Sequence, residues 1–451
     1  MQELVILALP IVASQSCDSI MVFTDRVFLS SLGSEQMNAA TGGGISSYLL
    51  STFFMGLIGF STALIAQYFG AKKYENCPKV TVQAIIISLC AYPFIIASLP
   101  LIYRYYGIMH LSPLQMYYQK MFVKILVYGS LISLLRYCFS CYFSGIGKTK
   151  IVMISAVVTM VINILFNYTF IFGHFGMPAL GMRGAAFGTI LSSFCGLCIL
   201  LFYFFKNSNY ETFGIKNAFH FDKLLSKKLI RYGAPAGTEF FFNFIAFSVL
   251  VFLFQAYNEE TATAASIMFN WDMISFVPLI GIEIGVTSLV GRYVGAKKIH
   301  VAERAAYSGV KVGWFYSAIV LVFFVFMPEL LVNTFKPHNT EALFELAKPL
   351  AIKMLQLAAI YVVAEAILES FVGALRGAGD TIWTMWVSMG IHWTFVPTLY
   401  ASLYIFKLGT VLSWALLVIE FLIFCIVFYF RFKTGKWKNI KLIDRQPMPE
   451  L

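Results

Sequence analysis

Several carboxylates lie where a carboxylate is costly, inside long apolar runs. Asp18 and Asp25 lie in the first run, which begins at Leu4, and Glu365 and Glu369 lie in a much later one. An ionisable group at bilayer depth costs several kcal/mol and is usually retained where it faces a cavity or a partner. These positions are therefore candidates for binding a cation or a proton.

Two pairs of polar residues have the spacing of one helix face. Asn163 and Asn167 are four residues apart, as are Glu365 and Glu369, so each pair presents its side chains together. Amide and carboxylate oxygens are the ligands that hard cations prefer. Two ionised glutamates at this spacing repel each other, so either one is protonated or both share a cation or a cationic substrate.

Other acids allow two interpretations each. Asp18 precedes Asp25 by seven residues, which is two turns along one face, and it either lines the same cavity or pairs with Arg26 or another residue of its half. Asp272 either lines a cavity or is solvated near the outer end of its segment. The alternative for every such group is a hydrogen bond that ties two helices together.

The composition shows what must position these groups. Of 451 residues, 59% are hydrophobic and 12% are charged, against about 25% charged in soluble domains. A membrane-spanning helix needs roughly 20 apolar residues, and the chain offers such runs from end to end. The first run lacks the basic start and cleavage site of a signal peptide, so we expect a retained helix.

The apolar runs and their breakers predict an all-α integral membrane protein with twelve transmembrane helices. The predicted spans are 4–30, 45–69, 79–103, 118–145, 151–173, 183–205, 229–256, 263–294, 306–328, 349–376, 381–406 and 409–431.

The basic residues favour one side of the membrane. The loops opposite to them, at Ser31–Ala40 and Ala256–Ala262, contain Glu35, Glu259 and Glu260 and no lysine or arginine. The positive-inside rule then places both termini in the cytoplasm of a multi-pass protein of the cell membrane. The net charge of +11 is thus an orientation signal, and we expect no nucleic-acid partner. The basic positions are Lys72, Lys73, Lys79, Lys148, Lys150, Lys206, Lys216, Lys223, Lys227, Lys228, Lys297 and Lys298, with Arg431, Lys433, Lys436, Lys438, Lys441 and Arg445 in the tail.

The sequence also repeats itself. Gln67-Tyr-Phe-Gly-Ala-Lys-Lys73 reappears as Arg292-Tyr-Val-Gly-Ala-Lys-Lys298, and Gly145-Ile-Gly-Lys-Thr149 corresponds to Gly377-Ala-Gly-Asp-Thr381. Leu9-Pro10 and Ala234-Pro235 open the first and seventh helices alike. Because each half has an even number of helices, the repeats are parallel and enclose a central cavity. We expect an N-lobe at 1–205, a linker at 206–228, a C-lobe at 229–431 and a cytoplasmic tail at 432–451.

Signals of enzyme chemistry are missing from the sequence. The CxxC pairs at 138–141 and 195–198 lie in apolar helices without a nearby histidine, which favours packing over metal or redox work. The six histidines never approach an HExxH spacing. His392 is interpreted as a packed histidine rather than a proton relay. We therefore expect no enzyme, and a channel would not require a central site carried by a repeat.

Several segments resemble one transporter family. Leu7-Ala-Leu-Pro10 with Phe23-Thr-Asp-Arg-Val27, and Gly373-Ala-Leu-Arg-Gly-Ala-Gly-Asp-Thr381, are similar to signatures of the multidrug and toxic compound extrusion (MATE) family. The segment Asn163–Gly173, followed by Gly176-Met-Pro-Ala-Leu-Gly181, resembles the fifth helix and next loop of its NorM branch. The resemblance implies twelve helices in two lobes and the antiport of amphipathic organic molecules, often cations, against Na⁺ or H⁺. It implies small-molecule substrates, no cofactor beyond the coupling ion, and a monomer.

The resemblance also carries roles onto residues of the first half. It implies that Asp25 on the first helix binds the coupling cation together with Asn163, Asn167 and Thr189, with no metal other than Na⁺ at these positions. Some members have an aspartate where Asn167 stands. The amide at that position weakens a purely proton-carrying interpretation.

The second half departs from the NorM pattern. The acid of the seventh helix falls at Asn243, with Glu239 one turn earlier, and the acid of the tenth helix aligns with Glu365. Cation or substrate binding there is assigned to Glu239, Asn243, Glu283, Glu365 and Glu369, with Asp18 and Asp272 as further cavity-lining candidates. The alternative function is a flippase for a lipid-linked precursor, from the same wider superfamily.

Overall fold

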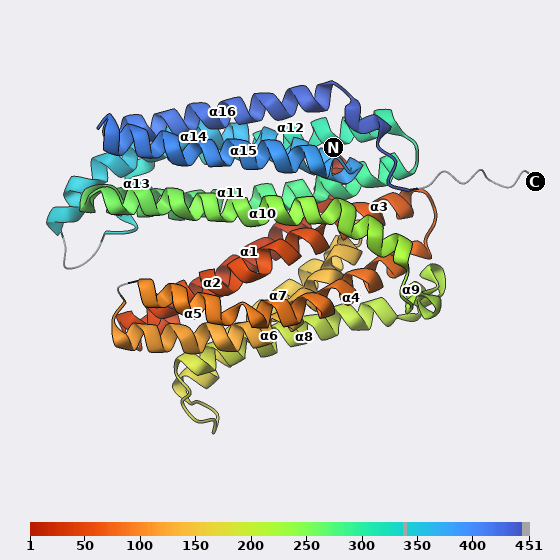
Figure 1. Cartoon of the computed structure of the whole chain (residues 1–451), viewed down its shortest axis with the longest axis horizontal. Coiled ribbons are helices and arrows are strands. Elements are labelled where there is room, and N and C mark those ends of the chain that lie inside the picture. Colours follow the sequence, from red (N-terminus) through yellow and green to blue (C-terminus); the bar gives the residue numbers. More distant parts are fainter. Residues whose placement is uncertain (110, 337–340, 444–451) are drawn as a thin grey trace, which may run out of the picture. The chain divides into compact units, whose positions relative to one another are not determined.

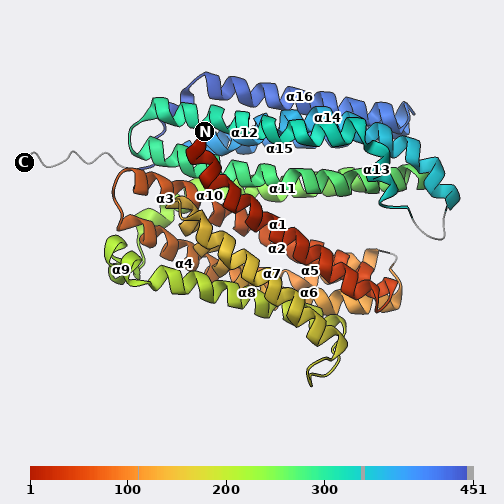
Figure 2. The ribbon, with the colours of Figure 1, turned by 180° about the vertical axis from the view of Figure 1, so that it is seen from behind.

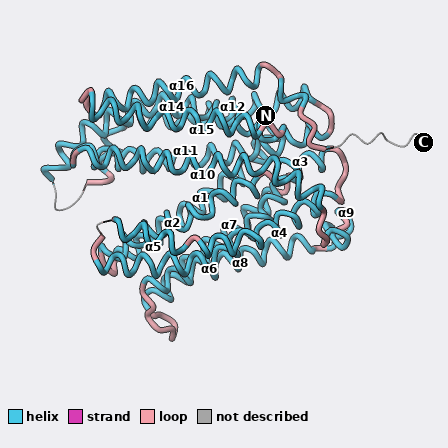
Figure 3. Tube along the Cα trace, in the orientation of Figure 1, coloured by secondary structure: helices cyan, strands magenta, loops and turns pink. Residues whose placement is uncertain are grey.

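The computed structural model describes residues 1–109, 111–336 and 341–443. In this part of the chain the regular structure is helical and no strand occurs (Figure 3). The all-α fold is as predicted. Arg445 and the rest of the predicted tail from 444 lie outside the described residues.

Helices occur at every predicted span. In the first half they are α1 (Gln2–Ser30), α2 (Ser34–Gly59), α3 (Ser61–Gly70), α4 (Asn76–Ala97), α5 (Leu99–Ile108), α6 (Pro113–Gly145), α7 (Thr149–Phe172) and α8 (Met182–Phe205). In the predicted linker lie α9 (Asn207–Phe213) and a 3₁₀ turn, Ile215–Ala218. The second half contains α10 (Lys223–Tyr257), α11 (Glu259–Gly295), α12 (Ile299–Phe326), α13 (Pro328–Asn333), α14 (Glu341–Ala378), α15 (Thr381–Tyr400) and α16 (Thr410–Lys433).

Eleven helical segments of the described chain are long and apolar enough to cross a membrane. Two of them are built from pairs of helices, since α2 with α3 and α4 with α5 are separated by single residues. The predicted eleventh helix corresponds to α15, which continues into a π-helical turn at Ala401–Ile405 and is not among the eleven. The polar side chains of Ser388 and His392 lie within α15.

Local sequence explains where several helices begin. The Ser112 side chain accepts a hydrogen bond from the backbone of Gln115 (3.1 Å) and Pro113 follows it, which is a favourable start for α6. At α11 the Asn258 side chain caps Thr261 N–H (2.7 Å), and two glutamates complement the positive end of the helix dipole.

The repeated sequence motifs adopt the same backbone turn. Lys72 and Lys297 are both left-handed, with φ of 59° and 60°. In each copy the second lysine N–H closes the turn on the carbonyl of a tyrosine, Lys73 on Tyr68 at 3.0 Å and Lys298 on Tyr293 at 2.8 Å. The repeat is therefore structural as well as sequential.

The chain divides into two compact units (Figure 1). Unit 2 comprises Ala13–Thr238, and its central helix is α6, which packs against α2, α4 and α8. Unit 1 comprises Met1–Val12 with Glu239–Leu451, and its central helix is α14, which packs against α11, α12 and α16 (Figure 2). Since α6 and α14 are the fourth predicted spans of their halves, corresponding helices have corresponding neighbours.

The start of α1 belongs to the unit built from the second half of the chain. A Cβ on Gly281 of α11 would lie 2.5 Å from the Val12 side chain, and one on Gly285 would lie 3.0 Å from Ala8. Small residues allow this close helix packing in membranes. The start of α10 is placed reciprocally in unit 2, where a Cβ on Gly233 would lie 2.5 Å from the Leu57 carbonyl of α2. The predicted lobe boundaries do not include this exchange, and the lobe assignment stays a prediction.

Candidate functional site

In unit 2, Asp25 lies in a cluster of amide and hydroxyl groups. Asn167 donates a hydrogen bond from Nδ2 to Asp25 Oδ1, and Thr189 donates from Oγ1 to Asp25 Oδ2 at 3.4 Å. Asn163 Nδ2 donates to Thr189 Oγ1 and to Ser192 Oγ, both at 3.5 Å. Helices α1, α7 and α8 thus bring together all four residues that the resemblance assigned to a cation site.

Two oxygens of this cluster lack a hydrogen-bond partner. Asn163 and Asn167 are fully buried, and neither Oδ1 atom has a donor. A buried acceptor left unsatisfied costs roughly 1–3 kcal/mol, so the arrangement is better suited to a site that gains a donor or a cation. Gly188 of α8 makes room for Asn167 Oδ1, because a Cβ there would overlap that oxygen.

Asp18 has a partner of its own. Its Oδ1 accepts from Arg136 of α6 at 3.1 Å, which matches one of the two interpretations left open for it, pairing within its half. Arg136 lies inside the predicted fourth span, where an arginine is as unusual as an acid. Arg136 was not predicted as a partner, because the candidates drawn from the sequence were intramembrane acids.

In unit 1, one arginine holds two of the candidate acids. Arg376 on α14 forms ion pairs with Glu239 of α10 (3.1 Å) and Glu283 of α11 (2.6 Å). The two carboxylate side chains are only 3% and 11% exposed, so their charges are largely removed from solvent. Glu369 also interacts electrostatically with Arg376 and with both acids. We define Glu239, Glu283, Glu369 and Arg376 as the arginine cluster.

Arg376 was not predicted as a partner of these acids, although the sequence contains a signal for it. Arg376 follows Glu369 by seven residues on one helix, so the two lie on the same face two turns apart. Following the face shared by Glu365 and Glu369 for two more turns along the same helix leads to Arg376.

A second group of acids in unit 1 has no ion pair with an arginine of the described residues. Glu365 of α14 is 7% exposed, and its Oε2 atom lacks a hydrogen-bond partner. It interacts electrostatically with Asp272 of α11, which in turn accepts a hydrogen bond from Tyr361. Asp272 is half-buried. Asp272 and Glu365 are called the acid pair, and Tyr361 is the hydrogen-bond donor to Asp272.

Asn243 belongs to neither group and is hydrogen-bonded to α15 instead. Its Nδ2 donates to Ser388 Oγ of α15 at 2.8 Å, and its Oδ1 is buried without a partner. His392 Nδ1 lies 2.9 Å from the Ser388 carbonyl and its ring packs edge-on against Phe424. This agrees with a packed, hydrogen-bonded histidine.

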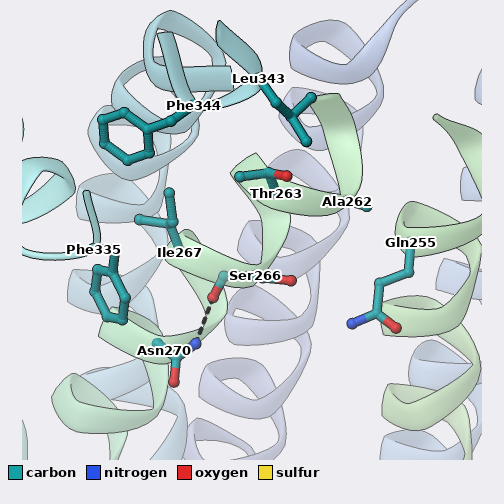
Figure 4. A pocket seen from close by; sticks show the side chains of 9 residues that line it. All are labelled: Gln255, Ala262, Thr263, Ser266, Ile267, Asn270, Phe335, Leu343 and Phe344. Carbon is teal, nitrogen blue, oxygen red and sulfur yellow. Dashed lines mark hydrogen bonds between the residues drawn. The ribbon is translucent and has the colours of Figure 1, made fainter. Parts of the chain in front are cut away.

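Unit 1 also contains an open cavity of about 470 Å³, and none of these acids is among its lining residues (Figure 4). Gln255 extends toward it from α10, and Thr263, Ser266 and Asn270 line it from α11. The rings of Phe335 and Phe344 form the apolar side. Among these lining residues there is no charge, so the cavity offers neutral hydrogen bonding and apolar contact.

Comparison with known proteins identifies relatives along nearly the whole chain. The MatE family model matches residues 10–169 and 235–400. "Probable multidrug resistance protein NorM" of Thermotoga maritima is 28% identical, covering 100% of this chain and 96% of its own, and the Bacillus subtilis protein of the same description is 24% identical, covering 87% and 86%.

Solved structures show the same fold. A transporter of the MOP superfamily from Pyrococcus furiosus aligns with a TM-score of 0.88 at 20% identity, covering 97% of this chain and 96% of its own. The structure described as "Crystal structure of MATE in the bent conformation" aligns with a TM-score of 0.86, also at 20% identity and over 97% and 96% of the two chains.

Proposed function

Since the chain belongs to the MATE family of multidrug transporters, we propose that it exports amphipathic organic molecules, often cations, by antiport with Na⁺ or H⁺. Transport would proceed by alternating access of two six-helix lobes, as in transporters built from repeats. The multi-pass membrane location follows from the family and the apolar helices. The cell membrane, cytoplasmic termini and a monomeric state are part of the proposal.

The observation that carries the proposal is the composition of the Asp25 cluster. A carboxylate, a threonine hydroxyl and two unsatisfied amide oxygens lie together in unit 2. Oxygen ligands of this kind suit a hard monovalent cation such as Na⁺. Asn167 now donates its NH₂ to Asp25, and a half-turn of its amide would present oxygen to a bound cation instead.

In unit 1 we assign the working acid to Glu365 rather than to the arginine cluster. Glu239 and Glu283 already have a counter-charge in Arg376, so a substrate cation would have to compete with an internal ion pair. Glu365 interacts electrostatically with Asp272, and its Oε2 atom has no hydrogen-bond donor in the described part of the chain. Two carboxylates in a low-dielectric site attract a proton or a cation.

The test of the first site is transport by purified protein in liposomes under separate Na⁺ and pH gradients. We expect Asp25→Asn to abolish gradient-driven export while helix content and unfolding stay unchanged, because the amide keeps the size of the side chain and removes the charge. Asp18→Asn is the matched control on α1, since Asp18 binds Arg136. Full gradient-driven transport by Asp25→Asn would refute the site.

The test of the second site compares substrates of different charge. We expect Glu365→Gln to impair export of a cationic dye more than that of a matched neutral dye. Glu420→Gln is the control, because Glu420 is another half-buried glutamate of unit 1 and is hydrogen-bonded to Thr398. Equal cation export by wild type and Glu365→Gln would eliminate Glu365. Absence of dye export by the wild type would favour the lipid-precursor flippase.

The proposed orientation has its own test. Cysteines placed at Lys72 and Lys297, which occupy equivalent turns of the two repeats, should be protected from impermeant reagents in intact cells. Labelling of either position from outside would overturn the cytoplasmic assignment.

A further inference from the structure

The chain between α8 and α10 is fixed to unit 2 by one buried side chain. Gln83 of α4 is fully buried, and its Nε2 donates to the His220 carbonyl at 2.9 Å. Its Oε1 accepts from Asp222 N–H at 3.1 Å and from Ser226 Oγ at 2.9 Å. This segment therefore has a defined inner face and a defined outer face.

The inner face is apolar. Phe213, Ile215 and Ala218 are buried, and Leu225 and Leu229 continue this side along the first turns of α10. Those turns belong to unit 2 as well. Ser226 is buried on this side too.

The outer face combines bulky apolar groups with cations. Phe219, Phe221 and Leu224 are 55%, 63% and 57% exposed. Lys223, Lys227 and Arg231 are exposed too, and their spacing of four residues places them in one row along α10. We define these six residues as the basic face.

Helix stability does not explain this row of cations. Lysine near a helix N-terminus opposes the helix dipole. The one favourable acid there is Asp222, whose Oδ1 caps the backbone N–H groups of Leu224 (2.9 Å) and Leu225 (3.0 Å). It is also the sole acidic residue between Thr212 and Thr238, so the cations outnumber the acids locally and an external anion would complement them.

We propose that the basic face binds the phosphate headgroups of anionic phospholipids in the leaflet that borders the start of α10. The row lies just before the apolar part of a membrane span, where juxtamembrane cations meet headgroups. Phe219 and Phe221 enter the boundary between headgroups and acyl chains, as the apolar side of an interfacial segment does. This binding goes beyond the proposed transport and uses none of its residues.

The probe is dioctanoyl phosphatidylglycerol added to the purified full-length protein in neutral detergent. Its apparent affinity is read from the shift of the thermal unfolding midpoint with lipid concentration, against phosphatidylcholine of the same chain length. A headgroup contact is worth about 5-fold in affinity per cation. We therefore expect Lys223→Gln, Lys227→Gln and Arg231→Gln together to weaken phosphatidylglycerol binding at least roughly 10-fold.

The matched control removes three exposed cations from unit 1, at Lys297, Lys298 and Arg304. It changes net charge equally and should leave the affinity for phosphatidylglycerol within about 2-fold of wild type. Phe219→Ser with Phe221→Ser keeps every cation and should weaken binding of the lipid. Unchanged circular dichroism and an unchanged midpoint without lipid establish folding for each variant.

Each contrary result overturns the proposal in a different way. Equal loss in the control variant would mean that net charge alone attracts the lipid. An equal midpoint shift with inorganic phosphate would mean that the face binds a free anion. No difference between phosphatidylglycerol and phosphatidylcholine in the wild type would mean that it is an ordinary solvated surface.

Discussion

Replacing Arg376 with glutamine would leave Glu239 and Glu283 buried without their counter-charge. Arg376 pairs with them at 3.1 and 2.6 Å, and their side chains are 3% and 11% exposed. Removing one partner of a buried ion pair costs roughly 3–5 kcal/mol, because the remaining charge is stranded. Arg376 is itself 26% exposed, and water reaching the site would moderate the loss, so we expect about 3 kcal/mol.

The assay is equilibrium unfolding in mixed micelles with a denaturing detergent, followed by circular dichroism. The variant with Arg376, Glu239 and Glu283 all replaced by glutamine should recover more than half of the loss, because no charge is then stranded. Lys336→Gln is the control, since its pair with Glu345 is exposed at 3.4 Å and is worth only about 0–1 kcal/mol. The reasoning is wrong if Arg376→Gln costs no more than the control, or if the triple variant is no more stable than Arg376→Gln.

Three further substitutions test the packing. Gly373→Leu should lower the unfolding midpoint strongly, because a Cβ there would lie 2.5 Å from a carbonyl oxygen of α11. Gly390→Ala is the control and should leave the midpoint unchanged, because the space around Gly390 is open. Equal midpoints for the two variants would contradict the close approach of α11 and α14. Gln83→Leu should make the segment before α10 cleave faster in limited proteolysis, since the three hydrogen bonds from Gln83 to His220, Asp222 and Ser226 are lost. Cleavage at the wild-type rate would show that other contacts hold this segment in place. Trp437→Ala should cost about 3–5 kcal/mol of unfolding free energy, because the ring is fully buried and stacked on Phe432; a cost under about 1 kcal/mol would mean that this ring is not part of the folded core.

The positions of the membrane helices could be read from the sequence, because hydropathy depends on residues that are neighbours in the chain. Twelve apolar runs were expected, and each coincides with a helix or a pair of helices. Details that depend on single residues were missed, such as the break at Phe60 between α2 and α3.

The candidate sites were predicted less evenly. Asp25, Asn163, Asn167 and Thr189 come together as the family resemblance implied. The partner of Asp18 could not be deduced, since Arg136 comes from another helix, 118 residues away in the chain. A burial argument marks a carboxylate as requiring a partner, but it does not identify that partner.

The exchange of the first helical turns has a consequence for synthesis. Val12 contacts Gly281, which leaves the ribosome 269 residues later (281 − 12 = 269). At about 5–20 residues per second, the start of α1 waits roughly 13–54 s for its partner. Unit 2 likewise completes only when α10 arrives, because Gly233 packs on Leu57. A fragment that ends at the linker does not contain a whole unit, and neither does a fragment that begins there. The two fragments should therefore fold fully only when they are expressed together.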